Sequence, residues 1–396
     1  MTSETAVAEA IMRGNINEAR ERLQNGEPLS GQYAENNKSQ IINAIFRAKA
    51  FDLIDRLIET GLVQTDVYEY DTFDRSVFKN IAMSLNGDEE SLSFLRDFMK
   101  KVRNKNDEVR DMTVLQFCME EAADPAIIQC LIGEGCDVQY KNNADMNLIY
   151  NVVGKGMLDE TKGRAYIETL LSNGVDVNHR NIMGTTPLML AVQRGKKNYL
   201  DLLLQHGADP NEQDNKGNSA FYYAVVEQQN RSVYDKLKEY ASPDFDSVNK
   251  DGEYILTGYL RMAGGSSSDM VGLLVQMLGD GANIYQASPY YSQPKSGVDW
   301  LAEKTPETVK AVLSSGAIEV NRQDNQGNTF LHKICAYNVN YDQEAAKRTY
   351  QKVRLLLEAG ADTSIVNDKE ETPMMLAAKD NLKVKTVDLL MQHKNN

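Results

Sequence analysis

The sequence predicts an all-α fold, a solenoid of repeated helix-turn-helix units with projecting hairpin loops. The first observation is a period of 33 residues, which separates Gly184 from Gly217 and Ala191 from Ala224. The same spacing separates three further pairs: Thr186 and Ser219, Gly174 and Gly207, and Asn178 and Asn211. The second is the composition, 42% hydrophobic and 25% charged, which is typical of a folded soluble protein. A repeat array also accommodates 396 residues without a new core for every 100–200 residues or so.

Each part of the repeated unit has a structural reason, which is clearest in residues 181–213. Thr186 is a good N-cap and Pro187 suits the first helical turn, so together they begin the first helix. The second helix carries a broad apolar stripe that includes Leu202–Leu204, and Gly207 ends it in a left-handed conformation. A single unit cannot bury its apolar face alone, whereas stacked units bury it against one another.

These phrases resemble the ankyrin repeat family. The resemblance is strong over roughly residues 165–230 and 310–380 and weak before residue 130. The phrases that carry it are Gly184-Thr-Thr-Pro-Leu188 with Ala191, Leu202-Leu-Leu204, Gly207-Ala-Asp-Pro-Asn211, Gly316-Ala317 with Asn321, Asp324-Asn-Gln-Gly-Asn-Thr-Phe-Leu-His332, Leu355-Leu-Leu357 with Gly360-Ala-Asp362, and Glu371-Thr-Pro-Met-Met-Leu-Ala-Ala378. The resemblance implies an ankyrin-type solenoid that works by binding proteins.

Weaker units extend outward from the clear repeats. One starts at Gly252, and an earlier one runs from Cys118 to Val138. The first part of the chain shows helix pairs by rhythm alone: Thr5–Arg13 with Ile16–Gln24, Ile41–Ala48 with Phe51–Glu59, and Ser76–Ser84 with Glu89–Lys100. We therefore divide the chain into divergent N-terminal ankyrin-like helix pairs, 1–110, and an ankyrin repeat array, 111–396, as one continuous solenoid of about ten or eleven units.

The longest departure from the period is residues 285–297, which lie where a hairpin tip belongs and are too long for one. They hold Tyr285, Tyr290 and Tyr291. Tyr is a favoured anchor at protein interfaces, and long loops of repeat arrays are often binding loops. The alternative is that the rings pack back onto the solenoid.

Two further segments interrupt the repeat. Residues 336–350 stretch one unit to a period of 43, and we expect them to lengthen the link between its two helices. Residues 264–269 predict a flexible link, with Ser268 or Asp269 as the next N-cap.

The net charge is −14, and the excess lies entirely in the first 300 residues, because residues 301–396 hold 13 basic and 13 acidic side chains. Nonspecific binding to nucleic acid or to an anionic membrane is therefore not expected. The acidic part either steers a basic partner or keeps the surface soluble. We find no apolar run of 18 residues and no secretory signal, so we expect a cytoplasmic monomer.

Candidate chemistry is sparse. The cysteines Cys118, Cys130, Cys136 and Cys335 lack metal-ligand spacing and are interpreted as small buried hydrophobes in a reducing compartment. Of four histidines, His332 ends an ankyrin phrase, and the resemblance implies that it stabilises the junction between hairpin and helix. We expect no catalytic residue, no metal, no cofactor and no enzymatic activity. The alternative is an enzyme, or an enzyme regulatory subunit, with its chemistry in residues 1–110.

The resemblance implies a protein-binding face made of hairpin tips and the exposed side of the first helices. The implied positions are Ile182, Met183, Thr185, Asn215, Lys216, Asn218, Lys250, Glu253, Asn325, Gln326 and Asn328 at tips, Gln193, Arg194, Val226 and Glu227 on first helices, and Tyr290 and Tyr291 in the long loop. Ile182 and Met183 are the sharpest candidates, because adjacent apolar side chains at an exposed tip reduce solubility unless a partner covers them. The alternative is that they pack on the neighbouring tip. The identity of the protein partner is left open.

Overall fold

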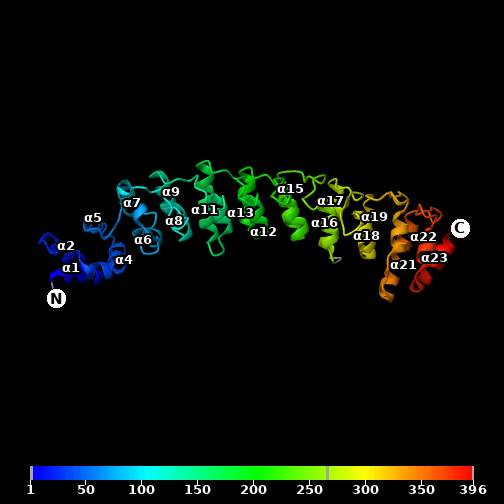
Figure 1. The fold of residues 1–396 in the computed structure, drawn as a ribbon, viewed down its shortest axis with the longest axis horizontal. Coiled ribbons are helices and arrows are strands. Elements are labelled where there is room, and N and C mark those ends of the chain that lie inside the picture. The colour runs from blue at the N-terminus through cyan, green and yellow to red at the C-terminus, as the bar shows by residue number, and fades with distance from the viewer. Residues whose placement is uncertain (1–2, 265–266, 395–396) are drawn as a thin grey trace. The chain divides into compact units, whose positions relative to one another are not determined.

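The computed structural model describes residues 3–264 and 267–394, and it forms two compact units, Met1–Ala208 and Asp209–Asn396. Each unit is a series of antiparallel helix pairs, a first helix followed by a second helix, joined to the next pair by a loop. Within each unit the pairs follow one another in chain order (Figure 1). The predicted all-α repeat solenoid is confirmed. The division at residue 110 stays a prediction.

The first unit contains six helix pairs in its described residues. The first helices are α1 Ser3–Met12, α4 Lys38–Ala48, α6 Val77–Ser84, α8 Val114–Glu120, α10 Leu148–Gly154 and α12 Pro187–Gln193; the second helices are α2 Ile16–Gln24, α5 Asp52–Glu59, α7 Glu89–Lys101, α9 Pro125–Gly133, α11 Glu160–Ser172 and α13 Lys197–Gln205. Two short elements, α3 Gln32–Asn36 and the 3-10 turn η1 Val67–Glu69, were not expected. The N-terminal pairs lie within a few residues of their predicted bounds, and α1, α4, α6 and α8 contact one another in series.

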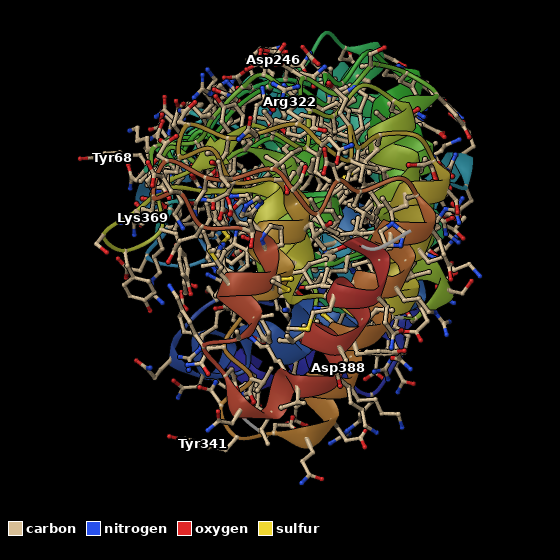
Figure 2. The ribbon with its side chains drawn as sticks, turned by 90° about the vertical axis from the view of Figure 1, so that its right-hand side faces the viewer. Tyr68, Asp246, Arg322, Tyr341, Lys369 and Asp388 are labelled. Atoms are coloured by element: carbon tan, nitrogen blue, oxygen red, sulfur yellow. The ribbon has the colours of Figure 1, made fainter. Side chains whose placement is uncertain are left out.

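The second unit contains five pairs in its described residues. The first helices are α14 Ala220–Tyr222, continued by the π-helix η2 Tyr223–Glu227, then α16 Ile255–Met262, α18 Gly297–Glu303, α20 Phe330–Ala336 and α22 Pro373–Ala377; the second helices are α15 Arg231–Lys238, α17 Ser268–Gly279, α19 Pro306–Ser314, α21 Gln343–Glu358 and α23 Val384–Lys394, preceded by η3 Asn381–Lys383. The strands β1 Ala287–Ser288 and β2 Lys295–Ser296 form an antiparallel hairpin. Asp246 and Arg322, on loops between pairs, lie in the upper part of Figure 2, whereas Tyr341, on the link within a pair, lies at its lower edge.

The helix boundaries follow the predicted capping. The Thr186 hydroxyl accepts a hydrogen bond from the Met189 amide at 3.3 Å, and Pro187 stands in the first turn of α12. Gly207 takes a φ of 85°, the left-handed conformation expected after α13. First helices elsewhere are capped in the same way, by Ser76, Thr113, Asn147, Ser219, Ser296, Thr329 and Thr372.

The core lies between first and second helices of neighbouring pairs. Leu202, Leu203 and Leu204 are all at most 2% exposed, and α13 packs against the first helix α12 and the preceding second helix α11. Helix α11 approaches α13 so closely that a Cβ on Gly163 would lie 1.9 Å from the Tyr199 hydroxyl oxygen. A larger side chain at residue 163 would therefore displace the buried Tyr199 ring.

Four lysines, of which Lys352 and Lys383 are buried, join consecutive pairs. Each donates its ammonium to carbonyl oxygens at the end of the first helix of the preceding pair, where the helix dipole is negative. The pairings are Lys155 with Glu120 in the first unit, and Lys304 with Ala263, Lys352 with Ala302, and Lys383 with Cys335 and Tyr337 in the second. Burial lowers the pKa of Lys304 and Lys383, and lowers that of Lys352 to about 8.

Two predictions about the irregular segments need correction. Residues 336–350 lengthen the link only up to Asp342; from Gln343 they lengthen the second helix, so that α21 has 16 residues. The N-cap of α17 is Ser267, whose hydroxyl accepts from the Met270 amide, and not Ser268 or Asp269. The predicted flexible link falls partly on residues 265–266, which lie outside the described residues.

Candidate protein-binding face

The hairpin tips share one local structure. In the first unit, the Asn181 side-chain oxygen accepts hydrogen bonds from the amides of Met183 and Thr185, each at 2.9 Å. The same pair of bonds is made by Asn142, Asp214, Asn249, Asp324 and Asn367. An Asn or Asp side chain at the start of each tip therefore fixes the tip backbone.

Three pairs of neighbouring tips are each hydrogen-bonded through one backbone rung. The residue that follows the Asn or Asp donates its amide to a carbonyl oxygen of the preceding tip. The three rungs are Ile182 to Ala144 at 3.1 Å, Lys250 to Lys216 at 2.8 Å, and Asp368 to Gln326 at 3.0 Å. Two of these rungs are accompanied by an amide contact, Asn249 to Asn218 at 3.2 Å and Asn367 to Asn328 at 3.1 Å.

The tip of the first unit exposes the two apolar side chains that the sequence singled out. Ile182 is 61% exposed and Met183 is 56% exposed, so more than half of each side chain is open to solvent. Gln193 and Arg194, at the end of α12, are exposed as well. Thr185 is buried, which corrects its place on the binding face: its carbonyl accepts from the Asn181 amide and closes the base of the hairpin.

In the second unit, Asn215, Lys216, Lys250, Asn325 and Gln326 are exposed at their tips, as predicted. Four neighbouring predictions need correction. Asn218 is buried because it bonds Asn249, and Asn328 is half-buried because it bonds Asn367. Val226 is 2% exposed within the π-helix, which leaves only Glu227 exposed there. Glu253 is turned inward.

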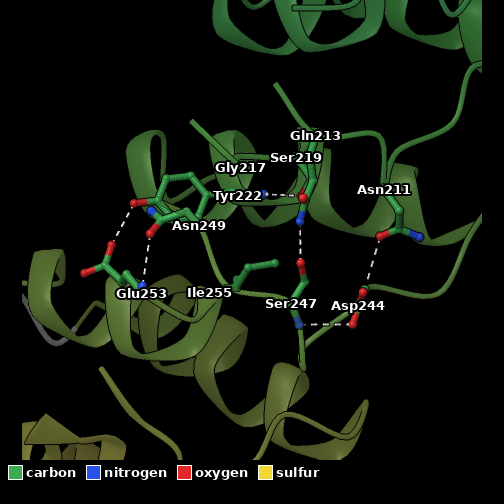
Figure 3. Close-up of a pocket in the computed structure, with 10 residues that line it drawn as sticks. All are labelled: Asn211, Gln213, Gly217, Ser219, Tyr222, Asp244, Ser247, Asn249, Glu253 and Ile255. Atoms are coloured by element: carbon green, nitrogen blue, oxygen red, sulfur yellow. Dashed lines mark hydrogen bonds between the residues drawn. The ribbon is translucent and has the colours of Figure 1, made fainter. Parts of the chain in front are cut away.

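Glu253 and its surroundings form a closed polar junction between two tips of the second unit (Figure 3). Its carboxylate accepts from the Tyr222 hydroxyl at 2.7 Å and pairs with Arg261. Burial, followed by the bond to Glu253, raises the pKa of Tyr222. The cavity at the junction measures about 20 Å³, room for about one water molecule. The junction is therefore a packing contact between pairs.

The long loop packs back at one tyrosine and exposes the next. The Tyr290 ring lies 4.8 Å from the Trp300 ring, and the Lys295 ammonium lies 4.0 Å from the Trp300 centroid. Tyr291, at a φ of 47°, is 94% exposed. Tyr285 bonds forward in the chain, since its hydroxyl oxygen accepts from the Glu319 amide at 2.7 Å.

A groove of about 290 Å³ lies between this hairpin and the tip at 324–328. At its wall Lys333 bridges Asp299 and Asp324, at 2.5 Å from each. Burial opposes the charge, but these two carboxylates raise the pKa of Lys333. At the rim the Arg322 guanidinium lies 3.9 Å above the Tyr285 ring. Asp299, Lys333 and Arg322 were not among the site residues predicted from the sequence.

His332 joins the start of α20 to the loop of the following pair. Its Nδ1 accepts from the Thr329 amide at 3.1 Å, which assigns the proton to Nε2, and Nε2 donates to the Glu371 carbonyl oxygen at 3.1 Å. Burial lowers the pKa of His332. The junction role that the resemblance implied for His332 is confirmed.

The cysteines are free thiols, with Cys118, Cys136 and Cys335 buried and Cys130 half-buried. Burial raises the pKa of Cys136 and of Cys335 to about 12. Within residues 3–264 and 267–394 no cluster of His, Cys, Asp and Glu has the arrangement of a metal site. In the same residues, no helix combines the length and apolarity needed to span a membrane.

Comparison with known proteins identifies the repeat. The family of ankyrin repeats, in three copies, matches residues 160–249. No curated protein matches the chain in sequence. Among solved structures, the chain is similar to the ankyrin repeat domain of Bcl-3, a member of the IkappaB protein family, at 24% identity over 61% of this chain and 97% of that one, with a TM-score of 0.48. It is also similar to a chain in the complex of the Bd0816 predatory endopeptidase from Bdellovibrio bacteriovorus with immunity protein Bd3460, at 19% identity over 52% and 96%, with a TM-score of 0.40.

Proposed function

Since this is an ankyrin repeat protein, we propose that it is a protein-binding scaffold without enzymatic activity, which holds a partner protein against its hairpin tips and the exposed ends of its first helices. The observation that carries the proposal is the adjacent exposed pair Ile182 and Met183. Each of these side chains would contribute about 1.5–3 kcal/mol if a partner buried it fully. Two adjacent exposed apolar side chains at one tip favour aggregation unless a partner covers them, so they indicate an interaction site.

The tip that carries this pair is already ordered. Two bonds from Asn181 fix its backbone, and the Ile182 amide is bonded to the preceding tip. Ordering an interface loop costs binding free energy, and a tip held in this way avoids most of that cost. The geometry therefore favours recognition by a preformed surface.

The helix pairs of residues 3–101 support the same function over the enzyme alternative. They contact one another in series and continue into α8, as the repeats further along do. The four free cysteines support a reducing compartment, and we place the protein in the cytoplasm as a monomer.

The test is affinity purification with quantitative mass spectrometry, followed by titration of the recombinant partner. The double variant Ile182→Asp, Met183→Asp should weaken binding of the partner at least about 100-fold, since about 3 kcal/mol of binding free energy from apolar burial is lost. The matched control, Met83→Asp with Met157→Asp, changes two methionines that are 67% and 99% exposed elsewhere in the same unit. The proposal fails if the tip variant and the control recover the same proteins in the same amounts.

A further inference from the structure

Among the described residues of the second unit, no backbone rung joins the long loop at 285–297 to the tip that follows it. Ile182, Lys250 and Asp368 each donate the amide that follows the tip Asn to a carbonyl of the preceding tip. The corresponding amide in the tip at 324–328 belongs to Asn325. In the part of the chain that the structure describes, the Asn325 N–H has no acceptor.

The rung to Asn325 is absent because the loop before it, residues 285–297, packs against the pair that precedes it. The hairpin of β1 and β2 leans on the pair before it: the Tyr254 amide donates to the Ser288 hydroxyl at 3.0 Å, and Pro289 packs against Gly252. Tyr285 extends in the other direction and contacts Glu319 and Arg322 of the following loop. The groove between hairpin and tip therefore occupies the place of the missing rung.

The groove offers hydrogen-bond donors. Besides the Asn325 amide, Lys333 has three N–H donors, of which Asp299 and Asp324 occupy two. The Arg322 guanidinium bonds Glu319 through one nitrogen at 3.1 Å and has further N–H groups. A ligand for this groove must therefore supply acceptors.

The charges in the groove decide which acceptors fit. Its lining has three carboxylates against two cations, a net charge of −1. Both cations are already paired with carboxylates, so a carboxylate or phosphate ligand would meet net repulsion. A neutral carbonyl oxygen makes the same bond without that repulsion. The carbonyls of an extended peptide, spaced along a strand, match this requirement.

We propose that this groove binds an extended segment of a partner protein, with a main-chain carbonyl of that segment accepting the Asn325 N–H in place of the missing rung. The inference rests on the proposed protein-binding function and assigns it a second contact, separate from the Ile182 tip. Recognition is through the peptide backbone, so the groove tolerates varied side chains and selects an extended conformation.

The test compares Asn325→Pro with Asn325→Ala. Proline removes the amide hydrogen and suits the second position of the turn, which the Gly327 amide closes by donating to the Asp324 carbonyl at 3.0 Å. Alanine removes only the side chain. The probe is a phage-displayed library of random dodecapeptides, selected on the full wild-type chain and remeasured as free peptides by fluorescence anisotropy.

We expect selected peptides to bind Asn325→Ala within about threefold of wild type and Asn325→Pro about 5- to 100-fold more weakly, the range for a lost hydrogen bond. In wild type, a saturating peptide should also slow hydrogen exchange of the Asn325 amide, which needs no variant. Equal binding by the two variants, no enrichment of peptides, or an unchanged exchange rate overturns the inference. So does a self-association that Asn325→Pro abolishes, because a second copy would then be the occupant.

The two proposals fail separately. If a partner is lost with the Ile182 and Met183 variant but binds Asn325→Pro normally, the groove is not part of the interface and the scaffold function stands. If neither set of variants changes the binding of any protein or peptide, both fail.

Discussion

Lys352 provides a quantitative test of the lysine contacts between pairs. Its side chain on α21 is 2% exposed and donates to the Ala302 carbonyl at the end of α18. Burial, with Arg348 nearby, lowers its pKa from 10.5 to about 8. Between these values the unfolded chain binds more protons than the folded chain, so the Lys352 contribution to stability rises with pH.

The size of the effect follows from the two pKa values. Each unit of pKa difference corresponds to about 1.36 kcal/mol, so the full difference is about 3 kcal/mol. From pH 7 to pH 9 the Lys352 contribution rises by about 1.3 kcal/mol, because the folded-state pKa lies inside that interval. Wild type should therefore gain about 1.3 kcal/mol relative to Lys352→Met over this range.

The measurement is urea unfolding followed by far-UV circular dichroism at pH 7 and pH 9, with the denaturant slope checked for equality between variants. Taking the difference between wild type and variant removes other groups that titrate in this range. The control is Lys347→Met, which removes an exposed lysine of the same helix. A wild-type minus Lys352→Met difference that is the same at both pH values would refute the reasoning.

Three further outcomes are expected. Asn321→Ala should lower the free energy of unfolding by about 1–3 kcal/mol in urea titration, because Asn321 bonds the Gly360 carbonyl at 3.0 Å and the Asp362 amide at 2.8 Å; a value near zero contradicts this. Gly327→Ala should destabilise more than Gly360→Ala by the same method: both have positive φ, but only at Gly327 would a Cβ meet backbone, at 2.9 Å. In the native protein, Cys130 should react with a thiol reagent before the three buried cysteines; simultaneous reaction would contradict the packing.

Much of the fold could be predicted from the sequence because the features that repeat are local ones. Thr186 with Pro187, and Gly207 after the leucine stripe, act through capping and backbone conformation, which depend on a few neighbouring residues. For the same reason, the helix pairs before residue 110 could be predicted from the spacing of apolar residues and helix ends alone. The Asn or Asp that fixes each tip is also visible in the sequence, since Asn181 and Asp214 each stand three residues before the tip glycine.

The parts of the site that were missed depend on contacts between pairs. Asn218 is polar and belongs to a tip, yet Asn249, 31 residues later, buries it. The groove around Lys333 exists because Ser288 of the long loop is hydrogen-bonded to the preceding pair. The composition of the loop does not show which neighbouring pair the loop packs against. Such contacts are set by the stacking of units, and a single unit carries no sign of them.

The lysine contacts give the array a one-way dependence. Every donor among Lys155, Lys304, Lys352 and Lys383 belongs to the pair that follows its acceptor. Deleting the last pair would leave the carbonyls of Cys335 and Tyr337 without their ammonium, whereas deleting the first pair would leave each of these four contacts in place. Removing the last pair therefore costs the array one of these four contacts, and removing the first pair costs it none of them.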